Sequence, residues 1–138
     1  MKSIVNFITG TLATSLLYYL GGWDIALEAL IIAVTLDYIS GVSNAIYHKE
    51  LSSKVGLIGI IKKLGYFVIV ALAVLLDRIF GETGALRTVV IYFFVSNEGI
   101  SILENWGEMG LPLPKKLFDI LEKLKNKDNE EIEDYEEV

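Results

Sequence analysis

Two strongly apolar runs enclose charged residues between Asp37 and Tyr66, and this arrangement limits how the chain can fold. The stretch reads DYISGVSNAIYHKELSSKVGLIGIIKKLGY, with an acid in the first run, two adjacent lysines in the second and a short polar connector between them. A soluble helical hairpin would need a wet face for these charges, and the neighbouring residues are too apolar to provide one. The pattern instead predicts two membrane-spanning helices joined by a basic loop. Ionisable groups inside a membrane are costly and indicate function.

The composition supports a membrane protein of one domain. The 138 residues are 53% hydrophobic and the mean hydropathy is +0.50, above the values of ordinary soluble domains. The net charge of −6 comes from residues 128–138, which hold seven acids and no base; residues 1–127 carry 12 bases and 11 acids, a net charge of +1. This balance leaves no basic face for nucleic acid. The absence of cysteine excludes disulfides and zinc–thiolate sites.

Four segments are long and apolar enough to cross a bilayer, which takes about 20 residues of helix. We predict an all-α integral membrane protein with a transmembrane domain over residues 1–110 and spans at about 4–20, 25–46, 57–80 and 86–105. Asp24 is expected to cap the second helix. The first span lies in an uncharged run, residues 3–23, for which a cleaved signal peptide is the alternative. No convincing cleavage site follows that run.

Small and polar residues form a stripe on the predicted helices, the reverse of a soluble amphipathic helix. The stripe of the second helix contains Ala26, Ala29, Ala33, Asp37, Ser40 and Asn44, and that of the third contains Gly56, Gly59, Lys63, Tyr66, Val70, Ala73 and Asp77. In lipid such stripes face other helices. We therefore expect six small residues to serve helix packing and oligomerisation: Gly10, Ala29, Ala33, Gly41, Gly56 and Gly59. A core helix of a soluble bundle is the alternative for the second segment.

The basic residues predict the topology. Ten of the twelve bases fall on one side of a four-span arrangement, and only Arg78 and Arg87 fall near the other. The excess of Lys and Arg on cytoplasmic loops then places both termini and the connector in the cytoplasm.

The same topology places four ionisable residues at a similar depth: Asp37, Lys62, Lys63 and Glu98. Either lysine could neutralise the two acids, because an unpaired charge in the membrane is costly. These charges have two possible roles. They hold the helices in register, or they serve function by lining a water-filled path or joining subunits. The sequence is compatible with both roles. A second set, Asp77, Arg78 and Arg87, is expected near the outer surface, where long side chains reach water and pairing is less important.

The C-terminal part is predicted to leave the membrane. Residues 105–114 are rich in glycine and proline, which indicates a turn. An amphipathic helix is expected over residues 111–126, with Pro114 near its start, lying on the inner leaflet or on a partner. Its apolar side holds Leu117, Ile120, Leu121 and Leu124. The acidic tail, residues 127–138, is expected to be disordered because of its charge.

Enzyme signatures are missing from the sequence. It contains no phosphate-binding loop, dinucleotide fingerprint or HExxH motif, and His48, its one histidine, has no neighbours at metal-ligand spacing. We therefore predict no enzymatic activity, no catalytic residue, no metal and no cofactor.

Two blocks of the chain, residues 36–66 and 96–117, resemble the phage holins of the toxin secretion/phage lysis type. The resemblance covers roughly residues 25–125. The residues that carry it in the first block are Asp37, Tyr38, Gly41, Leu51, Ser52, Ser53, Lys54, Gly56, Gly59, Lys62 and Lys63. Those in the second block are Asn97, Glu98, Ser101, Ile102, Glu104, Asn105, Gly110, Pro112 and Pro114. The acidic tail departs from the lysine-rich ends common among holins.

The resemblance implies a holin of Gram-positive phages or prophages. Such proteins accumulate in the cytoplasmic membrane, form homo-oligomers and open lesions through which an endolysin, or a large toxin, leaves the cytoplasm. An antiholin is a further partner that the resemblance implies. Two other classes stay open on the residues alone: a small ion channel or transporter subunit, and a membrane adaptor or antagonist that works through its C-terminal segment.

Overall fold

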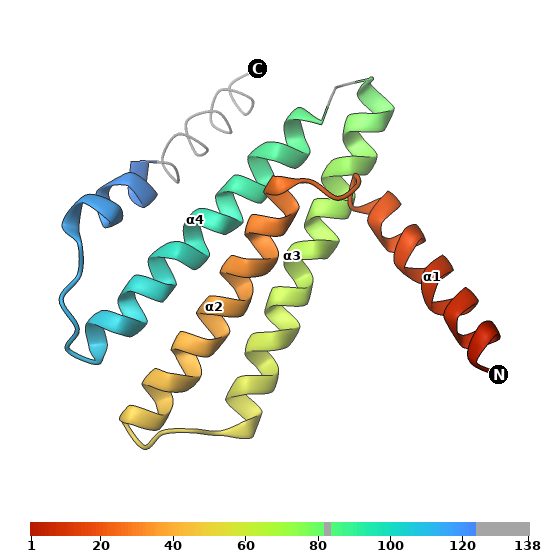
Figure 1. Cartoon of the computed structure of the whole chain (residues 1–138). Helices are drawn as coiled ribbons and strands as arrows, with labels where there is room; N and C mark the ends of the chain where they lie inside the picture. The colour runs from red at the N-terminus through yellow and green to blue at the C-terminus, as the bar shows by residue number, and fades with distance from the viewer. Residues whose placement is uncertain (82–83, 124–138) are drawn as a thin grey trace.

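The computed structural model describes residues 1–81 and 84–123, and within these residues the chain is helical and has no strand (Figure 1). Its helices are α1 (Lys2–Tyr19), α2 (Ile25–Tyr47), α3 (Ser53–Phe80) and α4 (Ala85–Glu108). A shorter helical stretch follows at residues 115–123. The all-α fold class is therefore confirmed.

Helix α4 is the centre of the arrangement. It packs along both α2 and α3, whereas α2 and α3 make few contacts with each other. Helix α1 touches only α3 among the described helices, and it points away from the other three (Figure 1). The fully buried apolar side chains are Leu27, Leu30, Val70 and Ile91, contributed by α2, α3 and α4. The fold is thus a three-helix core with one helix extending from it.

Three of the described helices are long and apolar enough to span a membrane: Ile25–Tyr47, Gly56–Phe80 and Ala85–Glu108. At about 1.5 Å per residue, their 23 to 25 residues extend about 35 to 38 Å, more than the hydrocarbon layer of about 30 Å. Helix α1 has 18 residues and is not among these candidates.

Local sequence signals explain where the helices begin and end. The N–H of Leu27 donates to Oδ1 of Asp24 at 2.9 Å, so the predicted N-cap of α2 is confirmed. Gly81 has a φ of +69°, the left-handed conformation in which glycine commonly ends a helix, and it follows α3 directly. Helix α3 begins at Ser53, four residues earlier than expected from the sequence.

The expected turn over residues 105–114 is partly wrong, because α4 continues to Glu108. The chain leaves the helix at Gly110, whose φ of +81° suits glycine. Pro112 and Pro114 then prevent the helix from resuming until residue 115.

The packing of α2 differs from the predicted stripe. Leu27 and Leu30 are buried, while Ala29 is exposed and Ala33 is half-buried. The reason is that α4 packs on the side of α2 that carries Leu27, Leu30, Asp37 and Ser40, which are all buried. Ala29 therefore has no role in packing within one chain.

The C-terminal helical stretch folds back on α4. A Cβ atom added at Gly99 would lie 3.0 Å from Leu121, and one at Gly107 would lie 3.0 Å from Leu113. Leu121 of the predicted amphipathic helix thus contacts its own chain, and the placement of this helix on the inner leaflet or on a partner stays a prediction. Leu124 and the acidic tail, residues 127–138, lie outside the described residues.

Candidate functional site

Six polar residues from α2, α3 and α4 meet between the helices. We call Asp37, Ser40, Lys63, Tyr66, Glu98 and Asn105 the central cluster. Lys63 Nζ lies 2.7 Å from Asp37 Oδ2 and also forms an ion pair with Glu98. One ammonium group from α3 therefore joins a carboxylate on α2 to a carboxylate on α4.

The other members of the central cluster satisfy the remaining oxygen atoms. The Tyr66 hydroxyl donates to Glu98 Oε1 at 2.9 Å. The amide of Asn105 donates to Ser40 Oγ at 2.9 Å and to Asp37 Oδ1 at 3.3 Å. Glu98 is only 2% exposed, so the Tyr66 hydroxyl and the Lys63 ammonium replace the water that its carboxylate has lost.

The cluster lies near the middle of the helices that could span a membrane. Asp37 is ten residues from Tyr47, Lys63 ten from Ser53 and Glu98 ten from Glu108. Ten residues correspond to about 15 Å along a helix axis, half of a hydrocarbon layer of about 30 Å. With the spans predicted from the sequence, 57–80 and 86–105, Lys63 and Glu98 would lie only six and seven residues from a helix end, because the prediction began α3 four residues late and ended α4 three residues early.

The structure brings together three of the four ionisable residues predicted to share a layer. Asp37, Lys63 and Glu98 are in contact, whereas Lys62 is exposed on another side of α3. Side chains of successive residues point about 100° apart around a helix axis, so the adjacent lysines cannot both face α4. Two carboxylates and one ammonium give the cluster a charge of −1 when all three are ionised.

The residues that carry the family resemblance, in blocks 36–66 and 96–117, lie beside the central cluster, at the start of α3, and along α4 and the connection after it. A Cβ atom added at Gly41 would lie 3.6 Å from the amide nitrogen of Asn105. One added at Gly56 would lie 3.9 Å from the hydroxyl oxygen of Tyr38. Ser52 precedes α3, which begins with Ser53 and the exposed Lys54. On α4, Asn97 and Ser101 are half-buried and Glu104 is exposed, while Gly110, Pro112 and Pro114 form the connection that follows.

A second polar group, which we call the turn cluster, contains Asp24, Asp77 and Arg87. Arg87 is 7% exposed, and its guanidinium donates to both carboxylate oxygens of Asp24, at 2.6 and 3.0 Å. It also donates to the backbone oxygens of Leu20, at 2.6 Å, and Gly22, at 3.2 Å. Hydrogen bonds from Arg87 hold the pKa of the Asp24 carboxyl below its usual value, although burial opposes this effect.

Asp77 links α3 to the start of α4 in the same cluster. It is 4% exposed and accepts from the backbone N–H of Leu86 at 3.1 Å and of Arg87 at 2.9 Å. The expectation that Asp77 and Arg87 need little pairing is therefore wrong. Arg78 is exposed as expected, and it donates to the Tyr18 backbone oxygen at 2.6 Å while lying 4.0 Å from the centre of that ring.

Two contacts had no clear signal in the sequence. The Asn44 amide donates to Glu108, which joins the ends of α2 and α4. Arg87 donates to the carbonyl groups of Leu20 and Gly22 at a turn in which Gly21 and Gly22 have φ of +84° and +91°. Nothing in the sequence pattern indicated that an arginine would bind this Gly-Gly turn.

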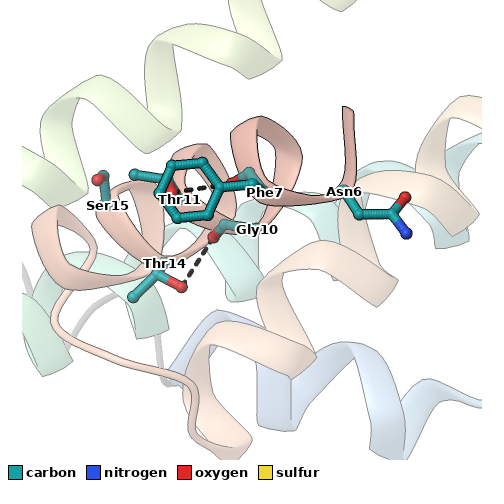
Figure 2. Close-up of a pocket in the computed structure, with 6 residues that line it drawn as sticks. All are labelled: Asn6, Phe7, Gly10, Thr11, Thr14 and Ser15. Carbon is teal, nitrogen blue, oxygen red and sulfur yellow. Dashed lines mark hydrogen bonds between the residues drawn. The ribbon is translucent and has the colours of Figure 1, made fainter. Parts of the chain in front are cut away.

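The surface of the described chain has a hollow on α1 and another between α2 and α3, and the second includes Asp37 and Lys63 of the central cluster. One runs along α1 and is lined by Asn6, Phe7, Gly10, Thr11, Thr14 and Ser15, with a volume of about 420 Å³ (Figure 2). The other, which we call the α2–α3 groove, consists of two adjoining hollows of about 210 and 230 Å³ that share Tyr38 and Lys63. Within residues 1–81 and 84–123, no group of three or more histidine or acidic side chains is arranged to hold a metal ion.

Comparison with known proteins gives one family. Residues 14–126 match the sequence profile of the bacteriophage holin family. An uncharacterised 14.9 kDa protein from the nagH 3′ region of Clostridium perfringens is 43% identical over 131 residues, which cover 92% of this chain and 99% of that protein. A protein described as a probable holin, from Bacillus phage phi105, is 30% identical over 115 residues, covering 83% and 85% of the two chains. No solved structure matches the chain.

Replacing Lys63 tests the central cluster. Lys63→Met leaves the buried carboxylates of Asp37 and Glu98 facing each other without a cation, and we expect a loss of about 3 to 5 kcal/mol in the free energy of unfolding. Lys62→Met is the matched control, because this neighbouring lysine is exposed and should change stability by less than about 0.5 kcal/mol. Denaturation in detergent micelles, followed by circular dichroism, measures both. Equal stability of the two variants would contradict the ion pairs of Lys63 with Asp37 and Glu98.

The two glycines of the α1–α2 turn give a second matched pair. Both have positive φ, so alanine at either position costs about 1 kcal/mol in backbone strain. At Gly21 the added Cβ would lie 2.5 Å from Arg87 Nε, whereas at Gly22 it meets no atom within 4 Å. Gly21→Ala should therefore lower the unfolding temperature clearly more than Gly22→Ala. Similar shifts for the two variants would show that Arg87 is not held at this turn.

Proposed function

Because this chain belongs to the bacteriophage holin family, we propose that it is a holin that oligomerises in the bacterial cytoplasmic membrane and forms lesions there. The lesions would release an endolysin for host lysis, or a toxin for export. Its helices make the chain a multi-pass membrane protein of a family without enzymatic activity. The observation that carries the proposal is the central cluster, a set of paired charges halfway along those helices.

The central cluster supports a protein that first lies inert in the membrane. Within one chain the ammonium of Lys63 contacts both carboxylates, and Tyr66 and Asn105 supply further hydrogen bonds. These pairs lower the cost of holding charge in a layer without water. The same groups favour a water-filled edge once helices of several copies rearrange, because polar surface at membrane depth is tolerated against protein or water.

We also propose that α1 is a fourth span, so that residues 1–110 form one transmembrane domain. Its 18 residues extend about 27 Å, and the run from residue 3 to 23 has no charge. Arg78 and Arg87 fix its C-terminal end beside the start of α2, at the side of the bundle opposite the connector. Both termini, the connector and residues 111–138 would then lie on the cytoplasmic side.

The alternatives differ in what they require of the C-terminal segment. A membrane adaptor or an antagonist would need residues 111–138 for its function, whereas a lesion former would not. The contact of Leu121 with Gly99 supports the second case, since it directs part of this segment to its own α4. A small ion channel would use the central cluster but pass only small solutes.

Expression in a bacterium tests the function. We expect an abrupt, delayed loss of membrane potential after induction, with lysis only when a cytoplasmic peptidoglycan hydrolase is also present. Membrane potential, culture turbidity and release of a large cytoplasmic reporter are measured together, with a chain truncated after Lys127 as control. The truncated chain should act like the full chain. Loss of potential with the reporter retained would indicate a small channel, and growth without depolarisation would contradict a lesion former.

Cysteine labelling tests the fourth span, since the natural chain has no cysteine. Ser3→Cys introduces a thiol at an exposed position in the first turn of α1, and Trp23→Cys introduces one at an exposed position just after its C-terminal end. If α1 crosses the membrane, a membrane-impermeant maleimide should label Trp23→Cys in intact spheroplasts and Ser3→Cys only in inverted vesicles. Labelling of both from one side would mean that α1 lies on the membrane surface.

A further inference from the structure

Helix α1 has almost no partner within its own chain. None of its 18 residues is buried, and large apolar side chains such as Phe7 and Leu12 are 75% and 65% exposed. One side of the helix is hollow at Gly10, between Asn6 and Thr14 (Figure 2). A helix this uncovered must be surrounded by lipid or by another chain.

The hollow side of α1 is suited to protein more than to lipid. The hydroxyl of Thr14 donates to the Gly10 backbone oxygen at 2.9 Å and that of Thr11 to the Phe7 oxygen at 2.8 Å, so both are satisfied within the helix (Figure 2). The Asn6 amide has no hydrogen-bond partner in the described part of the chain, and an amide without a partner is costly in lipid. Small residues on this side allow another helix to approach closely.

The α2–α3 groove exposes polar groups that a helix from another chain could cover. Its walls come from α2, the connector and α3, and its floor contains the ion pair of Asp37 and Lys63, whose side chains remain 11% and 15% exposed. Acyl chains over this floor would contact a salt bridge without offering hydrogen bonds. A helix with a small and polar side would cover the groove better than lipid.

We propose that α1 of one chain docks in the α2–α3 groove of a second copy, with Gly10 next to Gly59. This inference rests on the proposed function and on α1 crossing the membrane. Gly10 lies eight residues from Lys2, about 12 Å, and Gly59 and Lys63 lie six and ten residues from Ser53, about 9 and 15 Å. The small side of α1 therefore reaches the depth of the groove floor.

The polar groups of the two surfaces also match. Asn6 is four residues from Lys2, about 6 Å, and Gly56 is three residues from Ser53, about 4.5 Å. The Tyr38 hydroxyl lies beside Gly56, so it is at the right depth to bond the Asn6 amide of the docked helix. Space is available as well, since a Cβ added at Gly10 or at Gly59 meets no atom within 4 Å in the single chain.

Cross-linking tests the contact directly. Gly10→Cys and Gly59→Cys are made separately in the cysteine-free chain with different tags, co-expressed, and treated in membranes with a short bis-maleimide. We expect dimers that carry both tags, at a yield about tenfold above that of either variant alone. Dimers of Gly10→Cys alone would mean that α1 pairs with α1. A double variant that links only within one chain would place α1 in its own groove. Either result, or no linkage, overturns the proposal.

A bulky residue in the groove gives the second measurement. Gly59→Leu should lower the yield of mixed dimers, linked between Gly10→Cys and a Gly56→Cys partner, by about tenfold, which corresponds to about 1.4 kcal/mol of association free energy. Gly65→Leu is the matched control: it is on the same helix, meets no atom within 4 Å and does not line the groove. Equal yields for the two leucine variants would overturn the proposal.

Membrane potential separates this inference from the proposed function. The unmodified chain and each variant are assayed for depolarisation in the same cells. A chain that depolarises the membrane without forming mixed dimers leaves the holin function standing and removes the docking contact. Mixed dimers that form without any depolarisation support the contact and remove the function.

Discussion

The contact of Lys63 with Asp37 and Glu98 is the interaction on which the rest of the structure depends. Helices α2 and α3 make few contacts with each other, so they are held together through α4 and through this one ammonium group. Buried ion pairs are weak evidence for stability, because desolvation can exceed the attraction. Their value here is geometric: each carboxylate fixes the rotation of its helix, since any other rotation would leave a charge in lipid.

The two polar clusters constrain the chain in different ways. In the turn cluster, the planar guanidinium of Arg87 binds Asp24 through two parallel hydrogen bonds and reaches two backbone oxygens as well, so it defines one geometry. Lys63 is a point charge on a flexible stem, and it can follow its carboxylates if the helices move. The directional hydrogen bonds of Arg87 therefore restrict the geometry at Gly22 more than the ion pairs of Lys63 restrict the middle of the bundle.

The sequence placed Asp37, Lys63 and Glu98 in one layer because charges within apolar runs are few and helical spacing places them, but it also placed Lys62 there, which is exposed on another side of α3. The stripe of Gly59, Lys63 and Tyr66 already contained Lys63 and not Lys62, so the choice between the lysines was present in the pattern. The sequence placed Asp77 and Arg87 near the outer surface and Asp24 at the start of the second helix, but it did not predict that the three would form one cluster. Arg87 binds carbonyl groups turned toward it by glycines at positive φ, and such backbone geometry depends on tertiary structure. For the same reason the burial of Leu27 and the exposure of Ala29 followed from the position of α4.

An α1 helix in the groove of a neighbour makes a contact between unlike surfaces, so each copy donates one helix and receives another. Contacts of this kind continue until a ring closes, or without limit. In such an array, the neighbour's helix shields the ion pair of Asp37 and Lys63 from lipid. If that helix leaves, the same charges face either acyl chains or water, and water is much the better solvent for them. The high free energy of these charges in contact with acyl chains thus favours a water-filled edge wherever the array opens.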